Sequence, residues 1–223
     1  MYLHAVEICK LFERNGETVA ALADVTFSIE AGDLVGLQGD SGAGKSTLLN
    51  IIGGLERPSS GHVTLENLRL NDLSDDELAH YRRDTVGFVF QSAHLLPSLT
   101  VFENVMLPLI PAAGDEASKR ARVQEVLATV NIAHRAGHLP GELSGGEQQR
   151  AAVARAIVND PDIILADEPT GELDRSNADI ILELLTGLNA GGRTVIIASH
   201  DDRTLAVAGR RLVLDAGRLI SVG

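Results

Sequence analysis

The sequence predicts one α/β domain with a parallel-sheet core, an antiparallel N-terminal part and an inserted helical part. Over about residues 34–90 and 155–223, short apolar runs alternate with helical patterns, as in strands joined by helical crossovers. About residues 1–33 instead alternate apolar and polar side chains around Asn15-Gly16, a typical two-residue hairpin turn. About residues 91–154 have helical patterns interrupted by prolines, which predicts a small helical lobe.

A glycine-rich loop joins the apolar run Leu34–Leu37 to the helical pattern Ser46–Ile52. It reads GDSGAGKS and matches G-x-x-x-x-G-K-[ST], in which glycines let backbone amides approach phosphates. Lys45 is expected to reach the β- and γ-phosphates of a nucleotide, and Ser46 to offer its hydroxyl to Mg²⁺. A glycine-rich turn without a ligand is the alternative, but the strand–loop–helix context argues against it. The expected nucleotide-binding residues are Gly39, Asp40, Ser41, Gly42, Ala43, Gly44, Lys45, Ser46 and Thr47.

Two carboxylates follow the apolar run Asp162–Ala166. Carboxyl ends of parallel strands face the ligand crevice of an open α/β sheet. Asp167 is therefore expected to hold Mg²⁺ through a bound water, and Glu168 to act as general base on an attacking water. An acidic pair that only caps the next turn is the alternative, and the upstream phosphate loop favours the catalytic interpretation.

A second anion site is predicted in the octapeptide Leu143–Arg150, which reads LSGGEQQR and leads into a long helical pattern. Ser144 is placed as the N-cap, Gly145 and Gly146 leave backbone N–H groups uncovered, and Glu147 lies in the first turn. Uncovered N–H donors and the helix dipole both favour an anion at this end of a helix.

These motifs, in this order, resemble the nucleotide-binding subunit of ATP-binding-cassette (ABC) transporters over essentially the full chain, which implies a P-loop NTPase (RecA-like) core. Gln91, after the strand Val86–Phe90, matches the family glutamine that ligates Mg²⁺ and senses the membrane partner. Asp174 matches the D-loop aspartate, and His200 the switch histidine that contacts the γ-phosphate. Phe12 falls where the family places an aromatic side chain that stacks on adenine.

Three of these positions have alternatives or departures. Phe12 could be an ordinary core aromatic of the first strand, and His200 could cap the helix that follows the strand Thr194–Ala198. Glu172 stands where the D-loop of the family carries alanine or asparagine. It adds a charge near the expected dimer seam.

The resemblance implies a homodimer in the ATP-bound state with two composite sites. The signature residues Ser144, Gly145, Gly146 and Glu147 of one subunit would face the phosphate loop of the other. It also implies ATP and Mg²⁺ as cofactors, and a separate transmembrane permease as partner. The catalytic residues carried over from the family are Lys45, Gln91, Glu168 and His200.

Composition agrees with this interpretation. The formal charge of −12 argues against nucleic-acid binding, which requires a basic face. No run of about 18 apolar residues occurs, so direct membrane insertion is not expected. The N-terminus lacks the apolar core of a signal peptide, which favours a cytoplasmic location. There the expected permease would hold the chain at the inner face of the membrane.

The segments Gln91–Pro97, Thr100–Val105 and Ala166–Gly171 resemble the lipoprotein-release and macrolide-export group of these ATPases. Cell-division and amino-acid-importer ATPases share much of this pattern and remain alternatives. A soluble ABC ATPase without a transport role fits less well, because the DNA-repair class inserts a coiled coil or zinc module and the ribosomal class carries two cassettes.

Overall fold

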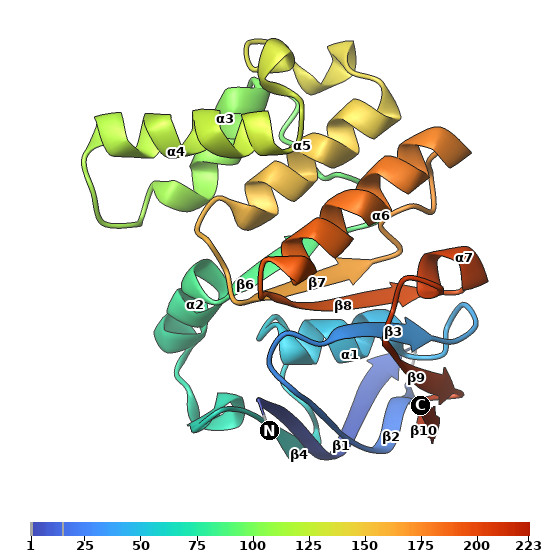
Figure 1. Cartoon of the computed structure of the whole chain (residues 1–223). Coiled ribbons are helices and arrows are strands. Elements are labelled where there is room, and N and C mark those ends of the chain that lie inside the picture. The colour runs from blue at the N-terminus through green and yellow to red at the C-terminus, as the bar shows by residue number, and fades with distance from the viewer. Residues whose placement is uncertain (1, 15) are drawn as a thin grey trace.

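The computed structural model describes residues 2–14 and 16–223, and it confirms the predicted fold class. Figure 1 shows a six-stranded core sheet with a helical lobe above it and a second sheet below. Five core strands are parallel and the edge strand β10 is antiparallel to β9. In spatial order the sheet contains β10 (Arg218–Val222), β9 (Arg210–Asp215), β3 (Leu34–Gln38), β8 (Thr194–Ser199), β7 (Ile163–Asp167) and β6 (Val86–Val89).

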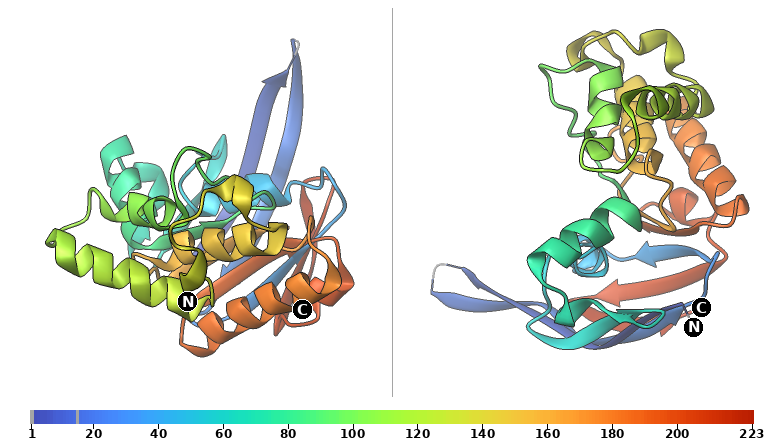
Figure 2. Two further views of the ribbon diagram at one scale, coloured as in Figure 1. Left: turned by 90° about the horizontal axis from the view of Figure 1, so that it is seen from above. Right: turned by 90° about the vertical axis from the view of Figure 1, so that its left-hand side faces the viewer.

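The antiparallel sheet has the order β2-β1-β4-β5. Its strands are β1 (Leu3–Arg14), β2 (Glu17–Ile29), β4 (Ser60–Leu65) and β5 (Leu68–Arg69). The β1–β2 hairpin projects from the body in both views of Figure 2. Arg14 pairs with Glu17 at its end, as a two-residue turn requires, although Asn15 itself lies outside the described residues.

The boundary of the antiparallel part differs from the expected one. β4 and β5 fall in the range 34–90 that was assigned to the parallel core, yet β4 pairs with β1, for example Leu65 with Leu3. Periodicity identifies a strand but not its neighbour, and pairing with β1 covers an edge that would otherwise be open.

The helical lobe contains α3 (Val101–Met106), α4 (Glu116–Thr129) and α5 (Gly145–Ile157). Helix α3 ends at Met106 and is followed by the 3-10 turn η2 (Leu107–Leu109), because Pro108 has no N–H to donate. The remaining elements are α1 (Lys45–Ile52), α2 (Asp75–Asp84), α6 (Arg175–Ala190), α7 (Asp202–Leu205), η1 (Leu70–Asp72), η3 (Ala133–Arg135) and η4 (Pro140–Glu142). Within the described residues, no helix is long and apolar enough to cross a bilayer.

The core sheet is buried on both faces, as parallel sheets are. Ile163 and Leu165 of β7 pack into one hydrophobic cluster with α1 and the antiparallel sheet. Ile164 and Ala166, which point the opposite way, pack into a second cluster with α3 to α6. Strand β7 is apolar along its whole length because one cluster buries each of its two faces.

A buried glutamine ties the helical lobe to the core. Gln149 of α5 is 2% exposed, and its amide donates to the carbonyls of Phe90 at 2.8 Å and Pro169 at 3.0 Å. Phe90 directly precedes Gln91, and Pro169 directly follows Glu168. One side chain therefore links the signature helix to both loops that carry expected catalytic residues.

Replacing this amide by an apolar side chain should destabilise the protein. Gln149→Met leaves the buried carbonyl of Pro169 and the partly buried carbonyl of Phe90 without this donor, so we expect the free energy of unfolding to fall by about 1–3 kcal/mol in urea titrations. Gln124→Met, on the exposed face of α4, is the matched control and should change it by less than about 0.5 kcal/mol. Equal losses in the two variants would contradict the tethering role.

Candidate functional site

A cavity of about 410 Å³ opens at the carboxyl ends of β3, β7 and β8. This edge is where open α/β sheets bind ligands. Its lining combines the phosphate loop with the residues expected to carry the chemistry. The lining residues are Ala21, Ser41, Gly42, Gly44, Lys45, Ser46, Thr47, Gln91, Asp167, Glu168 and His200.

The phosphate loop depends on glycine at defined places. Gly42 and Gly44 have φ of 84° and 102°, the left-handed region that side chains disfavour. A Cβ on Gly44 would also lie 2.6 Å from the carbonyl oxygen of Ala21, which excludes any larger residue. The loop runs directly into the N-terminus of α1, so its amides and the helix dipole point to the same place.

Lys45 lies at the centre of the site with its side chain only 6% exposed. Its ammonium donates to the carbonyls of Gly39 at 2.7 Å and Asp40 at 3.1 Å, and lies 3.3 Å from Glu168 Oε1. A buried ammonium requires such partners because desolvation is costly. The loop thus holds a cation where phosphates would bind.

Besides Lys45, two other side chains hold the carboxylate of Glu168. His200 Nδ1 lies 2.9 Å from Oε1, and the Ser199 hydroxyl donates to Oε2 at 3.2 Å. Its backbone has φ of 47°, a conformation rare outside glycine that often occurs at functional sites. Ser199 was not among the site residues expected from the sequence, where its only signal is its position next to His200.

Asp167 carries an unsatisfied atom. Its Oδ1 is buried and, among the described residues, has no hydrogen-bond partner. Burial raises the pKa of this carboxyl and so does repulsion from Glu168, while the Ser46 hydroxyl and Lys45 oppose the rise. One carboxylate and one hydroxyl fit Mg²⁺ at a nucleotide, which keeps waters and phosphates as its other ligands.

Gln91 lies beside the D-loop. A Cβ on Gly171 would be 3.3 Å from Gln91 Nε2, so the two loops are in close contact. The unusual Glu172 does not project freely, because its Oε1 accepts a hydrogen bond from Ser92 at 3.0 Å. This D-loop carboxylate is therefore hydrogen-bonded to the loop that contains Gln91.

The signature residues lie outside the cavity lining described above. Ser144 caps α5, and Glu147 completes a capping box with it. Gly146 packs so closely on Asn177 that any side chain would overlap it. Asp174, the D-loop residue, caps α6 and accepts from the Asn177 amide at 2.7 Å, so it supports this contact within the chain.

Phe12 also lies outside that lining, on the projecting β1–β2 hairpin. Its ring is 40% exposed, and the ammonium of Lys10 lies 4.9 Å from the ring centre. The side chain is therefore not a core aromatic.

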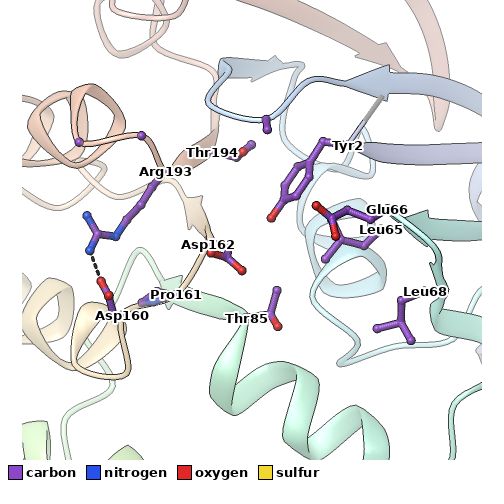
Figure 3. Close-up of a pocket in the computed structure, with 13 residues that line it drawn as sticks. Tyr2, Leu65, Glu66, Leu68, Thr85, Asp160, Pro161, Asp162, Arg193 and Thr194 are labelled. Carbon is purple, nitrogen blue, oxygen red and sulfur yellow. Dashed lines mark hydrogen bonds and ion pairs between the residues drawn. The ribbon is translucent and has the colours of Figure 1, made fainter.

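A larger cavity, of about 510 Å³, lies at the opposite ends of the strands. Figure 3 shows the hydroxyl of Tyr2 turned toward the side of the cavity that holds Asp162. Burial, and then the carboxylates of Asp162 and Glu66, raise the pKa of Tyr2 to about 12. This acidic interior would repel phosphates, so size alone does not identify the nucleotide site.

Comparison with known proteins identifies the family of this chain. A family model described as ABC transporter matches residues 22–171. The macrolide export ATP-binding/permease protein MacB of Burkholderia thailandensis is 44% identical over 218 residues, 98% of this chain. The chain spans about a third of that relative's length.

Two further matches extend over almost the full length of both compared chains. The uncharacterized ABC transporter ATP-binding protein MJ0796 of Methanocaldococcus jannaschii is 45% identical over 219 residues, 95% of this chain and 92% of that protein. The dimeric structure of a post-hydrolysis state of MJ0796, bound to ADP and Pi, has a TM-score of 0.92 at 42% identity and covers 99% and 97% of the two chains. The chain belongs to the ABC transporter family, and it is an ATP-binding cassette with the ATPase fold of that family.

Proposed function

We propose that this cassette hydrolyses ATP in composite sites between two copies of the chain and thereby drives a separate transmembrane permease. The convergence of Lys45, Glu168 and His200 beside Asp167 carries the proposal. The position of Ser144 outside this cavity supports a contribution from a second copy. The dimeric structure of MJ0796 with bound ADP and Pi adds support from a relative.

Binding of ATP would begin with an exchange of partners at Lys45. Its ammonium has three protons, which now face two carbonyls and Glu168. Phosphate oxygens carry more charge than carbonyls and would draw this cation toward the ligand. Glu168 would then lose a cation and become a better proton acceptor.

Hydrolysis would proceed by in-line attack of a water on the γ-phosphate. Glu168 would accept the proton of that water, with Ser199 holding its other oxygen and His200 directing a ring N–H to the phosphate. Asp167, Ser46 and Gln91 would hold Mg²⁺, which neutralises charge on the phosphates when bound. Phe12 would stack on the adenine from the hairpin.

The second copy would supply the signature. Ser144 and the amides of Gly145 and Gly146 would hold the γ-phosphate in trans, and loss of that phosphate would release the dimer. Asp174 would support this surface through Asn177.

The permease would contact the surface beside Gln91. Arg155 of α5 donates to the carbonyls of Ala93 and His94, each at 2.7 Å, so this surface moves with the signature helix. Such a partner would place the cassette on the cytoplasmic face of the membrane. The similarity to MacB favours an export or extraction type, with cell-division and importer types as alternatives.

Removing the proposed base should separate hydrolysis from binding. We expect Glu168→Gln to lower kcat by about a thousandfold, to keep ATP binding and to accumulate an ATP-bound dimer, measured by phosphate release and light scattering. Glu183→Gln, an exposed carboxylate of α6, is the control. A Glu168→Gln variant that stays monomeric at saturating ATP would contradict the composite site.

A bulky cation at the signature should block the partner's site only. We expect Ser144→Arg to lower kcat by about a hundredfold, while isolated monomers bind a fluorescent ATP analogue normally. Ala117→Arg places the same side chain elsewhere on the helical lobe as a control. Loss of monomer binding would mean that the signature acts within its own chain.

The proposed metal residue has a test that does not depend on turnover. Wild-type protein should bind ATP more tightly with Mg²⁺ than with EDTA, and Asp167→Asn should lose that difference in equilibrium titrations. Asp76→Asn, in the exposed first turn of α2, should retain it. An unchanged response to Mg²⁺ in Asp167→Asn would exclude this carboxylate as a ligand.

A further inference from the structure

The guanidinium of Arg135 contacts the signature residue Glu147. Arg135, at the end of the 3-10 turn η3 between α4 and α5, donates from Nε to Glu147 Oε1 at 2.8 Å. The Glu147 side chain is 13% exposed and that of Arg135 is 36% exposed, so solvent reaches this ion pair mainly from the arginine side. His138 Nε2 lies 3.3 Å from the same guanidinium, and His134 Nε2 lies 3.9 Å from Glu147 Oε1.

The other oxygen of Glu147 engages the signature serine. Glu147 Oε2 accepts from the Ser144 backbone N–H at 2.8 Å and from the Ser144 hydroxyl at 2.9 Å. A hydroxyl has one proton, and here it is donated to Glu147. Phosphate oxygens only accept hydrogen bonds at this contact, so Ser144 must turn its proton away from Glu147 before it can bind phosphate.

Glu147 is ionised during this exchange. The Ser144 backbone N–H, then the Arg135 guanidinium and then the Ser144 hydroxyl lower the pKa of Glu147 to about 2. A bare carboxylate three residues from the serine would repel the incoming γ-phosphate and retain the hydroxyl.

We propose that Arg135 is a positioning residue, which compensates the charge of Glu147 so that the Ser144 hydroxyl can transfer its hydrogen bond to the γ-phosphate on the partner copy. This inference rests on the composite site proposed above. Arg135 contacts Glu147 and would act on the phosphate only through it. Its loss should therefore weaken ATP-driven dimerisation without affecting ATP binding to a single chain.

The test measures dimerisation in a background that cannot hydrolyse ATP. In Glu168→Gln protein, Arg135→Gln should raise the ATP concentration for half-maximal dimerisation by about tenfold, because the uncompensated Glu147 would repel the incoming γ-phosphate and retain the Ser144 hydroxyl. Binding of a fluorescent ATP analogue to monomers should not change. Arg120→Gln, which removes an exposed arginine of α4, should dimerise like its parent.

A second substitution separates charge compensation from a merely structural role. Glutamine can replace glutamate in a capping box, so Arg135→Gln/Glu147→Gln keeps the cap and removes the uncompensated charge. We expect the double variant to dimerise within about threefold of its parent. Arg135→Lys keeps a cation beside Glu147, and we expect this variant to dimerise at a lower ATP concentration than Arg135→Gln. This comparison tests the role of the charge with a second variant in case Arg135→Gln folds poorly.

The outcomes distinguish this inference from the proposed function. Dimerisation of Arg135→Gln at the parent's ATP concentration, or no rescue by Glu147→Gln, would overturn the role of Arg135 and leave the composite site intact. Failure of the Glu168→Gln parent itself to dimerise would overturn both.

Discussion

The compensation of a buried lysine underlies the whole nucleotide site. Lys45 is almost fully buried in the phosphate loop, and its ammonium contacts two carbonyls and the carboxylate of Glu168. This arrangement requires β3 and β7 to end at the same edge of the sheet, with β8 between them. The two hydrophobic clusters that cover the sheet hold these strand ends in register. Packing of the core therefore fixes the positions of the residues that follow the strands.

The same electrostatic arrangement occurs at two places. Glu168 is held by Lys45, His200 and the hydroxyl of Ser199, whereas Glu147 is held by Arg135 and the hydroxyl of Ser144. In each case a carboxylate shares cations and a hydroxyl that phosphate oxygens would also attract. In the proposed dimer, binding of one γ-phosphate between two copies would therefore redistribute hydrogen bonds at both carboxylates and would link nucleotide occupancy to dimer formation.

A few polar side chains connect the helical lobe to the core in addition to the second hydrophobic cluster. Gln149 bonds to the loops of Gln91 and Glu168, and Arg155 holds the segment after Gln91. Glu172 adds a hydrogen bond from the D-loop to Ser92. The carboxylate of Glu172, which was expected to add a charge near the dimer seam, is thus hydrogen-bonded within its own chain. A movement of α5 would therefore be transmitted through these contacts to the surface where the proposed permease would bind.

The fold class and the strand–loop–helix around Lys45 could be predicted from the sequence, because each has a local pattern with a narrow physical meaning. Local patterns also singled out Glu168 and Ser144, whereas His200 was assigned from the family resemblance, and the roles of these three residues stay predictions. Local patterns do not report partners from distant segments. The pairing of β4 with β1, the support of Glu168 by Ser199 and the place of Arg135 behind Glu147 therefore became visible only in the folded chain. Those contacts depend on where separate segments meet after the core has packed, and no short-range spacing specifies that meeting.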